Sequence, residues 1–188
     1  MNQTDFTGSK ELVAMLDEAV ASQDTNQVIE AVKEGLCRLI RDERMRLPEE
    51  LTKPSDESYA RRLLYKDPEA AYEVIAMIWG PGQGTPLHDH CGIWCVDGVL
   101  PGQVAVTQYD LLERDGERFL FRAQQTVHAG VGTAGSLIPP FEYHTIRNDR
   151  PDPSITIHVY GGLMDRCTVF EPESKGWYRR HEKMLAYS

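Results

Sequence analysis

Residues 82–102 read GQGTPLHDHCGIWCVDGVLPG and contain a His-x-His pair, His88 and His90. Side chains two positions apart in a β-strand project from the same face, so the two imidazoles lie side by side, as two ligands of one metal ion must. Gly82 and Gly84, just before the pair, are typical of a tight turn that leads into a short strand. The stretch therefore predicts a metal site on a strand of a β-rich fold.

A third protein ligand must come from elsewhere in the chain. His144 follows a Pro-Pro turn in an apolar-flanked segment, and His158 lies within SITIHVY, the best strand pattern of the sequence. His128 and His181 have polar or loop-like surroundings. The pattern alone leaves the choice of the third ligand open.

The composition is that of a soluble globular domain. The chain has 188 residues, of which 41% are hydrophobic and 26% charged, which suits one domain with a full core. Its net charge of −9 argues against a nucleic acid or an anionic membrane as a partner, because both require a cationic face. No apolar run approaches a membrane span, and the N-terminal MNQTDFTGSK lacks the apolar core of a signal peptide. We therefore expect a cytoplasmic monomer that acts on small molecules.

The sequence changes in character along its length. Residues 1–56 are predicted to be largely helical, with apolar stripes at helical spacing and a capping box at Asp24 and Gln27. Residues 57–175 contain short β-type runs separated by turn residues, which predicts a sandwich or barrel. Residues 176–188 form a polar and aromatic tail that we expect to pack over the barrel or to be partly mobile. We expect these regions to form a single domain.

Several motifs taken together resemble the cysteine dioxygenase family. They are a Tyr-x-Arg segment at Tyr59 and Arg61, WGPGQGTPLHDH ending at His90, then His144, and HVYG beginning at His158. The set is specific although no single motif is, and it spans roughly half of the chain. The resemblance implies a mainly β fold, a cupin (jelly-roll-like) β-barrel with an N-terminal helical segment.

The resemblance also implies one Fe(II) per chain, bound by His88, His90 and His144. Ordinary cupins carry a glutamate ligand after the His-x-His pair, whereas Cys95 stands at that spacing here. Three neutral imidazoles leave Fe(II) with its full positive charge, and such a site favours an anionic, soft ligand such as a thiolate. We therefore expect a thiol dioxygenase that uses O₂ to convert a small carboxylate-bearing thiol, with L-cysteine first, to its sulfinic acid.

In the family, a histidine and a tyrosine form a relay beside the thiol and O₂ positions, and His158 and Tyr160 match them. Thr156 stands where relatives have a serine, and it keeps the hydroxyl that can hydrogen-bond to the imidazole. In animal members the residue that matches Cys95 is joined to the tyrosine by a thioether. A crosslink to Tyr160 and an unmodified thiol are both open for Cys95, and a fourth ligand in a zinc-like site is a third interpretation.

Arg61 stands where cysteine dioxygenases carry the arginine that binds the substrate carboxylate, and Tyr59 belongs to the same segment. A guanidinium can hold a carboxylate through two parallel hydrogen bonds. Arg166, shortly after the HVYG motif, is a second candidate at the mouth of the pocket. The alternative for Arg61 is a surface cation in a charged run.

Other functions fit parts of the sequence. One is a 3-mercaptopropionate dioxygenase, although these enzymes typically carry glutamine at the position of Arg61. Another is a non-catalytic metal-binding cupin sensor, which would need no relay and would usually carry an output segment. A zinc-dependent cupin isomerase would be expected to keep the glutamate ligand. Thiol-dependent consumption of O₂ separates the dioxygenases from the sensor and the isomerase.

Overall fold

Two helices cover one face of a two-sheet β fold in the computed structural model, which describes residues 4–140 and 142–188. The first three residues of the predicted helical region lie outside this range. Helix α1 (Ser9–Val20) and helix α2 (Thr25–Arg41) are followed by the short 3-10 helix η1 (Glu49–Leu51). The strands are β1 (Ala60–Lys66), β2 (Glu73–Trp79), β3 (Leu87–Asp89), β4 (Cys95–Val99), β5 (Gln103–Asp115), β6 (Arg118–Gly130), β7 (Ala134–Leu137), β8 (His144–Arg147), β9 (Ser154–Tyr160), β10 (Arg166–Pro172) and β11 (Trp177–Met184).

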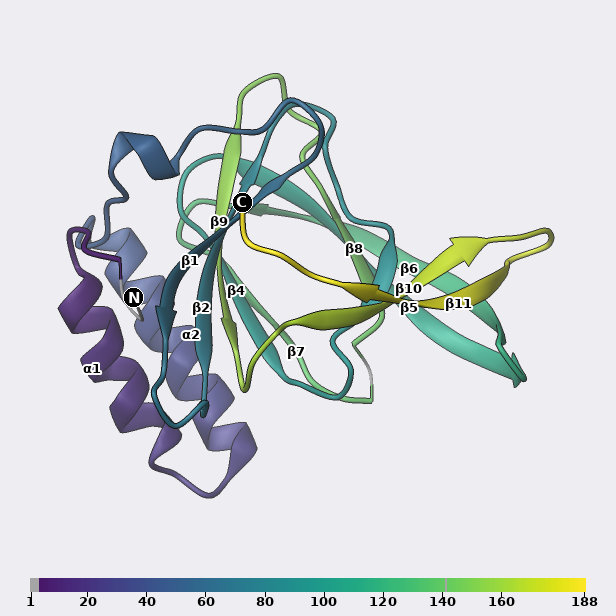
Figure 1. The fold of residues 1–188 in the computed structure, drawn as a ribbon, viewed down its shortest axis with the longest axis horizontal. Coiled ribbons are helices and arrows are strands. Elements are labelled where there is room, and N and C mark those ends of the chain that lie inside the picture. The colour runs from purple at the N-terminus through teal and green to yellow at the C-terminus, as the bar shows by residue number, and fades with distance from the viewer. Residues whose placement is uncertain (1–3, 141) are drawn as a thin grey trace.

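The strands form two groups that enclose the core. One is a sheet of order β1-β2-β9-β4-β7, and the other closes on itself in the order β10-β11-β6-β5-β8-β3. Figure 1 shows both helices on the outer side of the first sheet, while the β5–β6 and β10–β11 hairpins extend away on the opposite side. The predicted fold class, a mainly β barrel preceded by helices, is confirmed. No helix in the described residues is long and apolar enough to cross a membrane.

The N-terminal region divides into two helices at the position that its capping signal predicts. The Asp24 carboxylate accepts hydrogen bonds from the backbone N–H groups of Asn26 and Gln27 at 2.9 and 3.4 Å, and so fixes the start of α2. The Gln27 side chain does not complete the predicted capping box, because its carbonyl oxygen accepts instead from Ser22 Oγ at 3.2 Å.

Helix α2 lies directly on strand β4 because β4 contains a glycine at the crossing. A Cβ added at Gly98 would lie 2.8 Å from Leu36 Cδ2 and 3.0 Å from Ile40 Cδ1, closer than ordinary packing allows. Both of these helix side chains are buried in the core between the helices and the first sheet. This close approach seats α2 on β4, which pairs with β9 in the first sheet.

The C-terminal region differs from its prediction. Strand β11 lies beyond residue 175, where we expected the barrel to end, and it pairs with both β10 and β6. Its sequence, WYRRHEKM, is mostly exposed and has no apolar alternation, so the pattern that reveals half-buried strands is missing. The chain then returns to β1, where the backbone N–H of Ser188 donates to the carbonyl of Arg61 at 2.8 Å.

The turn before the His-x-His pair is built as the glycines predict. Gly82 has a φ of 78°, and a Cβ at Gly84 would lie 2.6 Å from the carbonyl oxygen of Ile146. The buried amide of Asn148 donates to the carbonyl of Trp79 at 3.0 Å and so connects the ends of β8 and β2. These contacts place β3 between β8 and β10, with His88 directly opposite His144.

Candidate metal centre

Three histidines converge in the interior of the barrel. One ring nitrogen from each of His88, His90 and His144 lies within 4.8 Å of the others. His88 is on β3, His90 directly follows that strand, and His144 begins β8. The rings are 8%, 1% and 1% exposed, respectively. The structure therefore brings together the ligand set that the resemblance implies, while His128 and His181 lie apart on exposed strands.

The orientation of two rings is set by backbone carbonyls. His88 Nδ1 lies 3.1 Å from the carbonyl oxygen of Pro86, and His144 Nδ1 lies 2.8 Å from that of Glu142. A carbonyl only accepts, so each Nδ1 carries the proton and each Nε2 keeps its lone pair. This arrangement is the one that metal-binding histidines use, so the donor set fits a divalent metal ion.

Burial gives the histidines the charge state that metal binding requires. Burial lowers the pKa of His88 to about 4 and holds the pKa values of His90 and His144 well below the ordinary range. All three rings are therefore neutral at pH 7, and their lone pairs are available to a cation.

Glu142 supports the cluster and was not predicted. Its carboxylate accepts from the backbone N–H groups of His90 at 3.3 Å and Gly92 at 3.1 Å. One of its oxygens also lies 3.8 Å from His90 Nδ1, which has no hydrogen-bond partner among the described residues. Burial raises the pKa of Glu142 to about 7. Its only signal in the sequence was its position two residues before His144, which does not identify its contacts.

The predicted relay residues lie on one face of β9. Thr156 Oγ1 is 2.7 Å from His158 Nε2, and His158 Nδ1 is 3.5 Å from the Tyr160 hydroxyl oxygen. The Tyr160 ring meets the His90 ring edge-on, with 5.3 Å between centroids. All three relay residues are buried. The relay therefore reaches the histidine cluster through Tyr160.

Cys95 lies beside the relay rather than among the metal ligands. It pairs with Tyr160 across strands β4 and β9, and its Sγ donates to Asp97 Oδ1 at 3.2 Å. Burial, assisted by Asp97, raises the pKa of this thiol well above its ordinary value. Cys95 Sγ does not converge with the three histidines but with Asp97 and His158, so the geometry does not support Cys95 as a fourth ligand of the histidine cluster. A crosslink to Tyr160 and a free thiol both stay predictions.

Arg61 and Tyr59 line the same small cavity as the three histidines. Arg61 is only 5% exposed, so it is not a surface cation. Its terminal nitrogens donate to the carbonyls of Ala186 at 3.3 Å and Met164 at 3.1 Å, and its Nε has no partner among the described residues. Tyr59 packs on Trp79 with 4.6 Å between ring centroids. Arg61 is thus a buried cation whose hydrogen bonds go only to uncharged groups.

Arg166 does not reach this cavity. It is exposed at the start of β10 and pairs in register with Met184, while the next residue, Cys167, points inward. The strand alternation that exposes one residue buries its neighbour. Five apolar side chains that sequence analysis did not identify also line the cavity: Met77, Ile146, Met164, Cys167 and Leu185.

Comparisons with known proteins identify a family and several similar proteins. Residues 49–173 match the sequence model of the family described as cysteine dioxygenase type I. The chain is similar to cysteine dioxygenase type 1 of Rattus norvegicus, with 21% identity over 114 residues, 60% of this chain and 56% of the relative. Cysteine dioxygenase type 1 of Danio rerio is 23% identical over the same share. The chain thus spans little more than half the length of these curated relatives.

The chain is also similar to a solved Klebsiella pneumoniae protein with a double-stranded β-helix domain. The two chains share 20% identity with a TM-score of 0.48, and the match covers 62% of this chain and 88% of that one.

Proposed function

This chain belongs to the cysteine dioxygenase type I family, and on that premise we propose that it is an iron-dependent thiol dioxygenase. The proposed reaction joins a small carboxylate-bearing thiol and one O₂ to give the sulfinic acid, RSH + O₂ → RSO₂H, so that both oxygen atoms end on sulfur. L-Cysteine is the substrate that we place first, and 3-mercaptopropionate is the alternative.

The observation that carries the proposal is that one cavity contains both the three-histidine cluster and the buried Arg61. Bound by His88, His90 and His144, Fe(II) would supply the redox chemistry by which O₂ oxidises the thiol sulfur. The ligand set contributes no negative charge, so it favours the thiolate form of a substrate.

Arg61 supplies the second attachment point for the substrate. Its charge is buried and faces no carboxylate within ion-pair distance among the described residues. A buried charge without a partner is costly, and an incoming carboxylate would remove that cost. Its two present partners are carbonyl oxygens, which a carboxylate replaces with stronger, charge-assisted hydrogen bonds. This favours an acidic thiol over an amine such as cysteamine.

The relay favours an enzyme over a metal-binding sensor. Burial raises the pKa of Tyr160 well above its ordinary value, so its hydroxyl keeps its proton and can donate to a bound thiolate or oxygen species. A sensor has no need for Tyr160, His158 and Thr156 in line beside the metal ligands.

The cavity is small in this structure. Its volume is about 20 Å³, which admits about one water molecule. Substrate entry therefore requires lining side chains to move, and Met164 and Leu185 are two of them. A methionine side chain changes conformation at low cost, so we expect Met164 to move first when a substrate enters.

Oxygen uptake by the iron-loaded full chain tests the proposal, with L-cysteine, 3-mercaptopropionate and cysteamine compared side by side. We expect uptake that requires thiol, produces the sulfinic acid, and has the highest kcat/KM for an acidic thiol. The His144→Ala protein with the same added iron is the matched control for metal-catalysed thiol oxidation in solution. Equal rates for wild type and control, or disulfide as the only product, would refute the function.

A further inference from the structure

Asp97 lies behind the relay histidine and belongs to neither the ligand set nor the motifs of the resemblance. It is on β4, directly opposite His158 on β9. Its Oδ1 is 3.6 Å from His158 Nδ1 and accepts from Cys95 Sγ at 3.2 Å. The distance between Asp97 Oδ1 and His158 Nδ1 is too long for a hydrogen bond. It is short enough for a strong attraction between the carboxylate and an N–H dipole of the ring.

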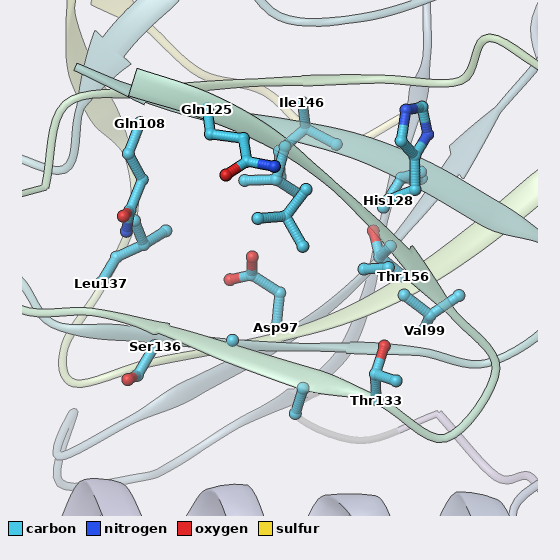
Figure 2. A pocket seen from close by; sticks show the side chains of 16 residues that line it. Asp97, Val99, Gln108, Gln125, His128, Thr133, Ser136, Leu137, Ile146 and Thr156 are labelled. Carbon is cyan, nitrogen blue, oxygen red and sulfur yellow. The ribbon is translucent and has the colours of Figure 1, made fainter. Parts of the chain in front are cut away.

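Asp97 faces a second cavity, separate from the one that holds the histidine cluster. This cavity has a volume of about 290 Å³, and Figure 2 shows the Asp97 carboxylate projecting into it among Gln108, Gln125 and Thr156. Its lining is mainly apolar, and the Asp97 carboxylate is one of its polar groups. The carboxylate thus lies between this cavity and His158. Burial raises the pKa of Asp97 to about 6, so the group is mainly ionised at neutral pH.

Three titratable groups face Asp97 from the elements around it. Cys95 lies on the same strand, His158 on β9, and His128 on β6 across the cavity. Burial, with a smaller effect of Arg61, lowers the pKa of His158 to about 3. His158 is therefore neutral and carries one proton, either on Nδ1 or on Nε2.

The hydrogen bonds on the other side of the ring favour the proton on Nδ1. Trp79 Nε1 lies 2.8 Å from Thr156 Oγ1, and an indole N–H can only donate. The Thr156 oxygen thus accepts from Trp79, and its own proton is free to donate to His158 Nε2 at 2.7 Å. The reverse arrangement, with Nε2–H donating to Thr156, leaves the Thr156 proton without an acceptor among the described residues, and it turns the Nδ1 lone pair toward a carboxylate.

We propose that Asp97 is a positioning residue that holds His158 in the Nδ1–H tautomer and thereby sets the direction of the hydrogen-bond chain. The chain then runs from Trp79 through Thr156 to His158 Nε2, with Nδ1–H pointing to Asp97 and to the Tyr160 oxygen. Tyr160 accepts from this side, so its own proton stays available to the cavity of the histidine cluster. A carboxylate beside a histidine N–H selects a tautomer in the same way in serine protease triads. The consequence for catalysis, though not the tautomer itself, rests on the proposed function.

The direct test is ¹⁵N NMR of the metal-free full chain with labelled histidine, which needs no enzymatic activity. We expect the Nδ1 of His158 to have the shift and the one-bond proton coupling of a protonated nitrogen, and Nε2 the shift of an unprotonated acceptor. A protonated Nε2 in the wild type would overturn the proposal at once.

Variants separate Asp97 from the Trp79–Thr156 contact. Asp97→Leu should raise the ratio of Nε2–H to Nδ1–H by roughly tenfold or more, the effect of losing one interaction with a charged group. Asp97→Ala is the second variant, in case leucine disturbs folding, and circular dichroism checks both. Gln125→Leu removes a polar group from the same cavity without touching His158, and should leave the tautomer unchanged. An unchanged tautomer in folded Asp97→Leu and Asp97→Ala would overturn the role of Asp97.

In the iron-loaded protein, Asp97→Ala should reduce kcat roughly 10–100-fold and change KM little. A loss of this size is usual when a residue that orients a functional side chain is removed. A larger effect on KM than on kcat would contradict a role through Tyr160. If the wild type oxidises no thiol, the proposed function fails while the NMR result on the tautomer stands.

Discussion

Each histidine of the cluster has a residue beside it that can orient its ring. For His88 and His144 that residue is a backbone carbonyl two positions earlier, so the strand geometry itself fixes the tautomer. For His90 the nearest group is the Glu142 carboxylate, 3.8 Å from Nδ1. Glu142 thus supports two of the three histidines: its carboxylate accepts from the backbone N–H of His90, and its backbone carbonyl orients the His144 ring.

Removing one ligand tests the cluster. We expect His144→Ala to lower the affinity for Fe(II) at least about 100-fold. Losing a residue that only hydrogen-bonds to a metal ligand costs roughly 10–100-fold, and losing the ligand itself should cost more. His128→Ala is the matched control, because His128 is half exposed on β6. Metal analysis after dialysis against a weak chelator measures the effect. Full iron retention by His144→Ala would remove this residue from the ligand set.

The Tyr160 hydroxyl is expected to act in the chemical step. Tyr160→Phe keeps the ring that packs against His90 and deletes one polar group. We expect kcat to fall on the order of 10–10³-fold, between the cost of one hydrogen bond to a charged group and that of one oxyanion donor. Steady-state kinetics with each thiol measures it, and wild-type turnover would show that Tyr160 only packs.

Arg61 is expected to determine substrate class. Arg61→Ala removes the cation from the cavity, so KM for acidic thiols should rise roughly 10–100-fold, as expected for a lost charge-assisted hydrogen bond. Cysteamine has no carboxylate, so its KM should change much less. Arg62→Ala, at the neighbouring position on β1, controls for a general loss of positive charge. Equal effects on cysteamine and the acidic thiols would exclude the carboxylate contact.

Sequence alone predicts these residues unevenly. His88 and His90 follow from strand spacing, whereas His144 required the resemblance, because His158 sits in a better strand pattern. Glu142 and Asp97 escape prediction because their contacts are made between strands far apart in sequence, and local periodicity carries no information about such contacts. Arg166 was predicted at the pocket because it follows the HVYG motif closely, but its side chain is exposed. Closeness to a motif in sequence does not determine which face of a strand a residue occupies.

At the level of elements, the helices and the inner strands carry clear signals, while β11 does not. The helices have apolar stripes and a capping aspartate, and β9 is buried along its whole length. β11 is held by backbone pairing and by surface ion pairs such as that between Arg179 and Glu173 at 2.8 Å. A strand stabilised in this way resembles a polar tail in its composition.

The packing of α2 on β4 can be tested at Gly98. Gly98→Val places carbon atoms where Leu36 and Ile40 lie, so we expect the free energy of unfolding to fall by about 1–3 kcal/mol through overpacking. Gly135→Val is the matched control, because Gly135 is on the neighbouring strand β7 and a Cβ there meets nothing within 4 Å. Urea denaturation of both variants measures the difference. Equal stability would show that α2 adjusts without cost.

For the molecule as a whole, concentrating neutral histidines in the core links stability to pH. Burial lowers the pKa values of four histidines, to about 4 for His88 and about 3 for His158. The unfolded chain protonates them near their ordinary pKa of about 6.5. The unfolded state therefore binds more protons below that pH, and the metal-free protein loses stability as the pH falls.

Two carboxyl groups oppose this trend without cancelling it. Burial raises the pKa values of Asp97 and Glu142 to about 6 and about 7, so the folded state takes up their protons before the unfolded state does. That contribution favours folding as the pH falls toward the ordinary carboxyl values of about 4. Near pH 5 the four histidines add protons to the unfolded chain and the two carboxyls add protons to the folded chain, so the unfolded chain holds about two more protons in total. Each extra proton lowers the free energy of unfolding by about 1.4 kcal/mol per pH unit as the pH falls.

We therefore expect the metal-free protein to lose on the order of 1–3 kcal/mol of stability per pH unit between about pH 6 and pH 4. Urea denaturation at pH 7, 6 and 5 measures the slope. His158→Gln should reduce this slope, because it removes one of the buried histidines. Bound metal competes with protons for the three ligands, so saturating metal should raise the midpoint at pH 7 more than at pH 5. A flat profile in the metal-free protein would mean that the histidine rings are hydrated in solution and not buried as they are in this fold.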